Sequence, residues 1–379
     1  MTNQQRRRKV VYIISHIDKA IGFEWIAEKL DPSKFELSFI LLNDKPSYLG
    51  RHLEEKGIHV REIPVGTKKN LPFLLLKVIK ALRKEKPDVI HTHMYIADII
   101  GQTAGKFLRV KKRIYTRHSS NENRKYHNKK RIDNLVNSLT THILAISENV
   151  KKILVTEEKV DPRKIRLIHH GFDLERFNSV PAGEVELLSG KYNPLQKRPV
   201  IGVVARYSHW KGIQYTIAAF KKVLGEYPNA LLLLANAKHG DYKDELATLL
   251  SGLPADSYHE IEFEHNLFAL YQLFDVYVHI PIDAELEAFG QTYVEALAAG
   301  IPSVFTNSGV AREFIKNREN ALLVDFKNPE QVYRAILELL ENAELRNTLI
   351  KNGREDVKSL FSLEKMIGNL ERLYAPETK

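Results

Sequence analysis

Glu287 and Glu295 lie eight residues apart and frame a short stretch that could bind both a phosphate and a sugar. Gly290 permits a tight turn, and the alanine-rich run after it predicts a helix from Gln291 to a C-terminal cap at Gly300. The first N–H groups of such a helix have no intrahelical acceptor and can bind an anion, while the two carboxylates could accept hydrogen bonds from hydroxyl groups. An amphipathic helix with two solvated glutamates would explain the same pattern.

Two cations, Arg206 and Lys211, lie in the predicted turn between a strand at 200–205 and a helix at 213–226. In parallel sheets the turn from a strand into a helix is where phosphates bind, so this pair could clamp a diphosphate. We expect the turn and the start of the Gln291 helix to lie at the same edge of one sheet. The alternative is a pair of solvated surface cations.

Three histidines lie at, or just after, the ends of predicted strands in the first half of the chain. His118 comes after a strand at 113–116, and His91 and His93 come at the end of a strand at 89–92. A histidine in such a place could take a proton or hydrogen-bond a substrate hydroxyl. A His-x-His pair could also chelate a metal, but no matching group of His and carboxylate residues stands out elsewhere, so we predict no metal site.

Short apolar runs alternate with longer helical patterns in both halves, which predicts two doubly wound α/β domains with parallel sheets. We expect an N-terminal domain at 1–172, a linker at 173–198, a C-terminal domain at 199–356 and a C-terminal helix within 357–379 that packs back toward the first domain. The linker is expected because this stretch lacks periodicity and holds Pro181, Gly183, Gly190 and Pro194. The expected strands of the two domains are 9–15, 36–42, 59–63, 89–92, 113–116, 142–146, 200–205, 230–235, 261–263, 276–279, 302–306 and 321–324.

Composition narrows the functional classes. The 379 residues include no cysteine, which excludes disulfides and thiol chemistry and fits a reducing cytoplasm. Residues 1–180 carry 36 Lys and Arg against 20 Asp and Glu, a net +16, whereas residues 181–379 carry 21 against 27, a net −6. The basic half is expected to face an anionic partner. A nucleic-acid-binding protein is one alternative, but no nucleic-acid-binding module is recognisable, so we predict no nucleic-acid partner.

Several common motifs are absent. No Gly-x-Gly-x-x-Gly opens either domain, and there is no Gly-x-x-x-x-Gly-Lys-[Ser/Thr] or Gly-x-Ser-x-Gly run. The sequence therefore does not favour a nicotinamide enzyme, a P-loop nucleotidase or an α/β-hydrolase.

The pattern Glu287-x-Phe289-Gly290-x-x-x-x-Glu295 resembles the signature of retaining GT-B glycosyltransferases of family 4. Further likenesses are spread over nearly the whole chain, including Arg206 with Lys211-Gly212, His91-x-His93, Thr116-x-His118 and His170-Gly171. The resemblance implies two Rossmann-like domains that face a central cleft.

The resemblance also implies roles for individual residues. Glu287 would bind hydroxyls of the donor sugar and stabilise its developing positive charge, Phe289 would line the donor site, and Glu295 would bind the ribose. The diphosphate would be neutralised by Arg206 and Lys211 together with the backbone near Gly22, Gly290, Gln291 and Thr292. His118 would hydrogen-bond the transferred sugar near the reacting centre. No metal or other cofactor is implied, because the cations take the metal's place.

Three departures from the family pattern concern lost glycines. The early Gly-Gly-x-Glu loop reads Ile21-Gly22-Phe23-Glu24, Asn236 and Ala237 replace two glycines after a strand, and Val310 follows Gly309 where a second glycine is usual. Each added side chain narrows a place where backbone approaches ligand. Given these lost glycines, a catalytically inactive scaffold is one alternative. Another GT-B enzyme, a sugar phosphorylase or a nucleotide-sugar epimerase, is a second.

The resemblance and the charge together predict the partners. A UDP-sugar is the expected donor, and a lipid-linked or cell-envelope glycan is the expected acceptor. Residues 71–82 form an apolar stripe interleaved with Lys77 and Lys80, as in a helix that lies on an anionic membrane, although a core helix with a basic face would read the same. We therefore expect a cytoplasmic protein, peripheral on the inner face of the plasma membrane. The sequence indicates no particular oligomeric state.

Overall fold

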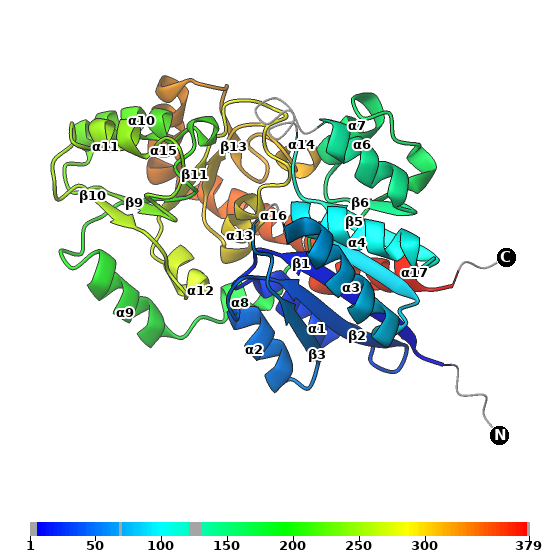
Figure 1. Cartoon of the computed structure of the whole chain (residues 1–379). Helices are drawn as coiled ribbons and strands as arrows, with labels where there is room; N and C mark the ends of the chain where they lie inside the picture. Colours follow the sequence, from blue (N-terminus) through cyan, green and yellow to red (C-terminus); the bar gives the residue numbers. More distant parts are fainter. Residues whose placement is uncertain (1–5, 68–69, 121–129, 377–379) are drawn as a thin grey trace. The chain divides into compact units, whose positions relative to one another are not determined.

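A computed structural model describes residues 6–67, 70–120 and 130–376. The chain forms two compact units. Unit 1 comprises Met1–Phe172 and Leu363–Lys379, and unit 2 comprises Asp173–Ser362. Each is an α/β unit built on a parallel sheet, as the alternation of short apolar runs and helical patterns predicts (Figure 1).

The sheet of unit 1 has seven parallel strands in the order β3-β2-β1-β4-β5-β6-β7. The strands are β1 Arg8–Ser15, β2 Phe35–Leu42, β3 His59–Ile63, β4 Val89–His93, β5 Lys112–Arg117, β6 His142–Ala145 and β7 Ile165–Leu167. The central strands are buried on both faces, which is why they read as continuous apolar runs in the sequence.

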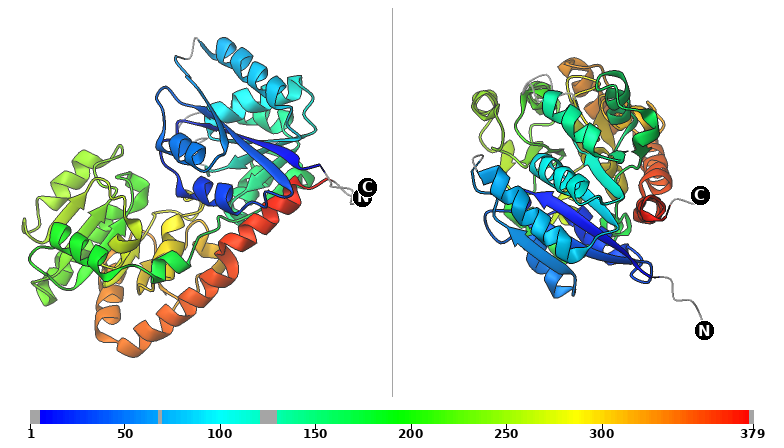
Figure 2. Two further views of the ribbon diagram at one scale, coloured as in Figure 1. Left: turned by 90° about the horizontal axis from the view of Figure 1, so that it is seen from below. Right: turned by 45° about the vertical axis from the view of Figure 1, so that its right-hand side comes forward.

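Helices cover both faces of this sheet (Figures 1 and 2). They are α1 Ile21–Lys29, α2 Tyr48–Glu55, α3 Leu71–Glu85, α4 Tyr95–Phe107, α6 Lys130–Leu139, α7 Glu148–Thr156 and α17 Leu363–Tyr374. The buried residues of α3 and α4 share a core with Val11 and Ile13 of β1. Tyr12 faces the other side of the sheet, where its ring contacts Phe23 of α1 and Tyr374 of α17.

The end of the chain belongs to unit 1. Lys112 Nζ donates to the carbonyl oxygens of Leu373 and Ala375, each at 2.8 Å, and so caps α17. Tyr374 is fully buried. Within the segment expected as one C-terminal helix, the structure instead has the end of α16, Ala343–Phe361, a break at Ser362, and then α17. The break coincides with the boundary between the units.

The sheet of unit 2 has six parallel strands in the order β10-β9-β8-β11-β12-β13. The strands are β8 Val200–Val204, β9 Leu231–Ala235, β10 Tyr258–Ile261, β11 Val276–His279, β12 Ser303–Phe305 and β13 Leu322–Leu323. The structure has β10 at Tyr258–Ile261, where the sequence predicted a strand at 261–263. Phe263, one of the apolar residues behind that prediction, is exposed and lies outside the sheet.

The first two helices of unit 2, α8 and α9, lie in the stretch expected to be a linker, and seven more follow in the described part of the unit. They are α8 Glu175–Asn178, α9 Ala182–Tyr192, α10 Ile213–Glu226, α11 Lys243–Leu250, α12 Leu267–Tyr271, α13 Gln291–Ala299, α14 Ala311–Phe314, α15 Pro329–Glu341 and α16. Phe177 of α8 is buried against Phe268 and Tyr271 of α12. This stretch is therefore a packed part of unit 2, not a free connection.

Both sheets reverse their strand order between the first and fourth strands of the unit. The reversal lies between β1 and β4 in unit 1 and between β8 and β11 in unit 2. Loops that leave the carboxyl ends of such neighbouring strands diverge and leave room for a ligand. The predicted site residues of each unit follow these strands or their immediate neighbours.

Candidate active site

A buried ion pair joins the loops after β8 and β11 in unit 2. Lys211 Nζ lies 2.6 Å from Glu287 Oε2, and both side chains are nearly covered, with 13% and 9% exposed. His279, the last residue of β11, places Nε2 3.3 Å from the same carboxylate oxygen. Lys211 and Glu287 are 76 residues apart in the chain and meet because β8 and β11 are adjacent strands.

Backbone contacts fix the turn that carries Lys211. Gly212 has φ +76°, and a Cβ atom there would lie 1.9 Å from the carbonyl oxygen of Ile280. Next to it, the N–H of Ile282 donates to the carbonyl of Trp210 at 3.0 Å. A side chain at position 212 would therefore separate this turn from the loop after β11.

The loop that carries Glu287 is held from its other side by Gly309. A Cβ atom on Gly309 would lie 2.8 Å from both Glu287 Cγ and the Phe289 carbonyl oxygen. Val310 N–H donates to that carbonyl at 2.9 Å. Val310 itself is fully buried with an ordinary helical φ of −68°. The position therefore takes a valine without strain, because its side chain packs into the core.

The start of α13 is free to bind an anion. Gly290 is its N-cap with φ +84°, Gln291 is exposed and Thr292 is half-buried. The backbone N–H groups of these three residues donate no hydrogen bond to any residue that the structure describes. Phe289, just before them, is buried against Phe361 rather than open to solvent. The backbone here, and not the phenyl ring, is what a ligand can reach.

The pKa values of the two glutamates of this segment are shifted in opposite directions. Burial would raise the pKa of Glu287, but the Lys211 charge and the His279 hydrogen bond outweigh it and lower that pKa to about 2. Burial raises the pKa of Glu295 to about 7, although the hydroxyl of Tyr271 donates to its Oε2 at 2.8 Å and partly opposes the shift. Glu287 is thus a permanent carboxylate, and Glu295 can gain or lose a proton near neutral pH.

Arg206 lies in the turn after β8, five residues before Lys211. Its side chain is exposed and makes no ion pair or hydrogen bond with the residues that the structure describes. The guanidinium is therefore available to an incoming anion.

Unit 1 brings the predicted histidines together at the ends of β4 and β5. His93 Nδ1 lies 3.0 Å from His118 Nε2, and the ring of His170 stacks on His118 with centroids 5.7 Å apart. His91 is hydrogen-bonded through both ring nitrogens, to Tyr374 at 2.7 Å and Thr116 at 2.8 Å. Both nitrogens of His91 are occupied, and no group of three or more His, Asp or Glu among the described residues could hold a metal ion.

Gly22 lies in the first turn of α1, beside this cluster. The next residue, Phe23, packs its ring on His93 with centroids 4.8 Å apart. A Cβ atom on Gly22 would meet no atom within 4 Å, so packing inside the protein does not require glycine here. The open space beside Gly22 is available to a ligand.

Two residues of the site, His279 and Tyr271, were not expected from the sequence. His279 ends a strand of the pattern Val-Tyr-Val-His, and a polar residue at a strand's carboxyl end is the same signal that identified His118. Tyr271 lies in the buried helix α12, where nothing in the sequence separates it from the other aromatic core residues.

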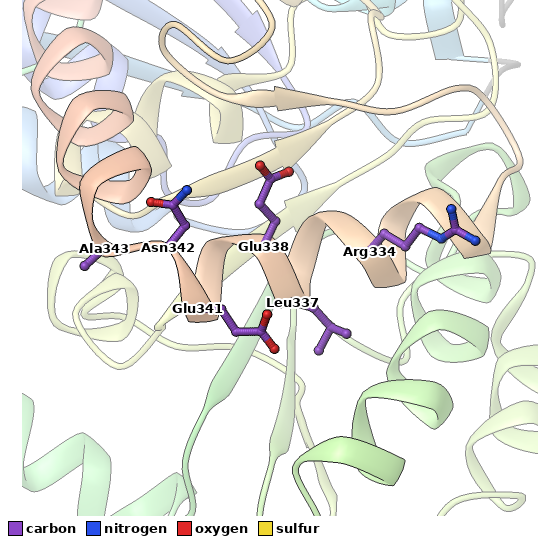
Figure 3. A pocket seen from close by; sticks show the side chains of 6 residues that line it. All are labelled: Arg334, Leu337, Glu338, Glu341, Asn342 and Ala343. Carbon is purple, nitrogen blue, oxygen red and sulfur yellow. The ribbon is translucent and has the colours of Figure 1, made fainter.

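A surface hollow elsewhere in unit 2 has no part in this site. Figure 3 shows the residues that line it, on α15 and at the start of α16: Arg334, Leu337, Glu338, Glu341, Asn342 and Ala343. Two of its charges are already paired, Arg334 with Glu330 at 2.9 Å and Glu338 with Arg318 at 2.7 Å. None of the predicted site residues lines the hollow.

Two family models match the chain, one over much of each unit. Residues 26–176 match the model described as Glycosyltransferase Family 4, and residues 185–356 match Glycosyl transferases group 1. The capsular polysaccharide biosynthesis glycosyltransferase CapM of Staphylococcus aureus is 26% identical over 309 residues, 79% of this chain and 80% of CapM.

A second relative and a solved structure agree with these models. The Escherichia coli UDP-Gal:alpha-D-GlcNAc-diphosphoundecaprenol alpha-1,3-galactosyltransferase is 24% identical over 79% of this chain and 78% of its own length. The structure of Anabaena HepE in complex with UDP-glucose superimposes with a TM-score of 0.83 over 96% of this chain and 99% of HepE, at 19% identity. The chain therefore belongs to the family 4 glycosyltransferases and is a glycosyltransferase of the GT-B fold.

Proposed function

We propose that this protein transfers a sugar from a UDP-sugar to a lipid-linked or cell-envelope glycan, with retention of anomeric configuration and without a metal ion. The observation that carries the proposal is the buried Lys211–Glu287 pair, 2.6 Å apart, with the exposed Arg206 in the same turn as Lys211 and the open start of α13 just after Glu287. Cations, free backbone N–H groups and a permanent carboxylate are the groups that a sugar diphosphate requires.

Each group has a distinct task in the proposed reaction. Lys211 and Arg206 neutralise the charge that builds on the diphosphate as the bond from its oxygen to the anomeric carbon breaks. Lys211 has three N–H donors, so it can bind a phosphate oxygen without leaving Glu287. The negative charge of Glu287 stabilises the positive charge that develops on the sugar ring, and Glu295 accepts hydrogen bonds from the ribose hydroxyls.

The acceptor hydroxyl attacks from the face that the diphosphate leaves, so the new bond has the configuration of the old one. The departing phosphate oxygen takes the acceptor's proton, which balances the step without a separate base. His118 hydrogen-bonds a hydroxyl of the transferred sugar. Since cations neutralise the leaving group in this scheme, it requires no metal.

The names of related proteins support the choice of substrates. HepE is described in complex with UDP-glucose, and the E. coli relative by its name transfers galactose from UDP-Gal to a diphosphoundecaprenol-linked sugar. CapM is named for capsular polysaccharide biosynthesis. A uridine-linked donor and a lipid-linked or envelope acceptor are the substrates consistent with these names.

The exposed face of α3 supports attachment to an anionic membrane, which would bring the enzyme to such an acceptor. Phe73 and Leu76 are 67% and 62% exposed, next to the exposed Lys77 and Lys80. Apolar side chains flanked by cations are typical of a helix that lies in the headgroup region. Among the described residues, no helix is long and apolar enough to cross a bilayer.

The proposal is tested by thermal denaturation with UDP-, GDP- and ADP-sugars, followed by UDP-release assays with undecaprenyl-diphosphate-linked acceptors, with and without EDTA. We expect UDP-sugars to stabilise the fold, by about 2.7 kcal/mol at 100 times Kd, and EDTA to leave turnover unchanged. The anomeric proton of the first product, followed by NMR, should show retention. Donor turnover without acceptor would indicate an epimerase instead, and a requirement for free phosphate would indicate a phosphorylase.

A further inference from the structure

His93 makes a direct contact with His118 that the proposed reaction does not use. Its Nδ1 lies 3.0 Å from Nε2 of His118. Two neutral imidazoles can share such a bond only if one nitrogen carries the proton and the other does not. The proton on His93 therefore determines which nitrogen of His118 carries a proton.

The ring of His93 is held tightly on its other sides. It is 4% exposed, stacks on Tyr12 with centroids 5.2 Å apart and an interplanar angle of 11°, and meets Phe23 edge to face at 4.8 Å. Its Nε2 is buried without a hydrogen-bond partner among the described residues. Because this nitrogen is buried and has no partner in either form, its protonation state follows from whether a bare N–H or a bare lone pair costs more to leave unpaired.

An orphaned buried N–H group is rarer in proteins than an under-used acceptor, which indicates that the N–H is the costlier group to leave unpaired. The favoured tautomer of His93 is thus unprotonated at Nε2 and protonated at Nδ1. It then donates to Nε2 of His118, whose own proton must reside on Nδ1. Burial lowers the pKa of both histidines, that of His118 to about 4, so neither ring carries a second proton at neutral pH.

We propose that His93 is a positioning residue that fixes His118 in the Nδ1–H tautomer, so that His118 presents a hydrogen-bond donor to an oxygen of the transferred sugar. His118 is half-buried, and its Nδ1 makes no hydrogen bond within the described part of the chain. The inference rests on the proposed function for the identity of the oxygen that is bound. The tautomer itself is a property of the protein without substrate.

The tautomer is tested on the ligand-free protein with ¹⁵N-labelled histidine, by long-range ¹H–¹⁵N correlation NMR, with the His118 signals assigned from a His118→Gln variant. We expect a protonated Nδ1 and an unprotonated Nε2 on His118 at neutral pH. In His93→Phe the bond is lost and His118 should move toward the Nε2–H form. In His93→Asn, the side-chain amide occupies the place of Nδ1 and can donate, so the wild-type pattern should return.

His91→Asn is the matched control, since His91 lies on the same face of β4 and bonds to Tyr374 and Thr116 but not to His118. It should leave the His118 tautomer unchanged. A proton on Nε2 of His118 in the wild type, or the same tautomer in His93→Phe as in the wild type, would overturn the proposal. Because these spectra require no turnover, they decide the matter even if the donor or acceptor is not the one proposed.

The kinetic consequence is a separate measurement. With UDP-sugar and acceptor, His93→Phe should lower kcat by about 10- to 100-fold, by analogy with the loss of partners that orient histidines at metal sites, while the Kd for UDP stays the same. His93→Asn should recover most of the lost kcat. Equal losses in the Asn and Phe variants, with melting temperatures like the wild type, would show that the hydrogen bond does not matter for the reaction.

Discussion

At the scale of single residues, burial has opposite outcomes for two carboxylates on one short segment. Both Glu287 and Glu295 are less than 10% exposed. Glu287 faces a lysine and a histidine and stays ionised, whereas Glu295 faces a neutral tyrosine hydroxyl and holds its proton up to about pH 7. The partner, not the depth of burial, decides the charge.

The Lys211–Glu287 pair predicts a large effect of removing the lysine. Lys211→Ala should slow transfer by an amount equivalent to about 2–4 kcal/mol in the transition state, because the diphosphate loses its nearest buried cation. The pKa of Glu287 should also rise, since the Lys211 charge is what lowers it. The measurement is kcat/KM for the UDP-sugar, with Lys221→Ala on the exposed face of α10 as the control. Wild-type kcat/KM in a folded Lys211→Ala protein would place the diphosphate elsewhere.

Glu295 predicts a pH dependence of donor binding. The ribose hydroxyls donate to its carboxylate, so the affinity for UDP-glucose, whose diphosphate does not titrate near neutral pH, should rise as pH passes through about 7. Calorimetric titration at pH 6 and pH 8 measures this. Glu295→Gln should bind more weakly and show no such rise.

The same raised pKa affects folding stability in the opposite direction. Its folded-state value lies above the usual range, so the stabilisation is fully present below the unfolded pKa and is lost as pH rises through about 7. Glu295→Gln should therefore unfold at a higher temperature than the wild type at pH 8, and the two should differ less at pH 5.

The binding measurement decides the role of Glu295 in the donor site. A wild-type affinity for UDP-glucose that is flat from pH 6 to pH 8 would contradict the assigned role of Glu295.

At the scale of elements, sequence patterns located those segments whose ends are marked by glycine or by sharp changes of polarity. Helix α13 begins and ends where Gly290 and Gly300 predict, and both glycines adopt positive φ. Helices α8 and α9 were not predicted, because they are short or lack a clear apolar stripe, and their stability comes from packing, such as Phe177 against Phe268. The sequence predicted only that Lys211 and Glu287 lie near the same edge of one sheet. Whether they form an ion pair depends on which strands are neighbours in the sheet, and the sequence does not show that.

The glycines at the starts of two helices predict separable effects. Gly212→Ala should destabilise unit 2, since the new methyl group would strike the Ile280 carbonyl at a positive φ. Gly22→Ala should leave the melting temperature unchanged or slightly higher, because nothing lies within 4 Å, yet weaken donor binding if the diphosphate approaches there.

Gly190→Ala is the control for Gly22→Ala. It lies in α9, a helix that holds none of the predicted site residues, and no atom lies within 4 Å of its Cβ position, so both stability and donor binding should be retained. Thermal unfolding and UDP-glucose titration of the three variants separate the effects. Unchanged binding in Gly22→Ala would remove Gly22 from the proposed donor site.

At the scale of the whole molecule, charge is divided between the two halves of the chain. The first 180 residues carry a net +16 and the remainder a net −6. The exposed face of α3 adds Phe73 and Leu76 to this positive field, and Phe107 of α4 is 63% exposed beside Arg83. The sequence left two interpretations of α3 open, a helix that lies on a membrane and a core helix with a basic face. The structure supports part of each. Leu74, Val78 and Leu82 are core, yet apolar residues also face solvent. Two further cations expected to add to this basic surface, Lys68 and Lys69, lie outside the described residues.

This surface predicts reversible binding to anionic membranes. The protein should sediment with phosphatidylglycerol-containing liposomes at low salt, remain in the supernatant with neutral ones, and be released at high salt, since each cation near the surface contributes about 1 kcal/mol and salt screens it. Lys77→Glu/Lys80→Glu should abolish binding, and Phe73→Ser/Leu76→Ser should weaken it at every salt concentration. Leu187→Ser/Leu195→Ser removes two equally exposed leucines from unit 2 and should change nothing. Equal recovery from neutral and anionic liposomes at low salt would favour an acceptor taken from solution.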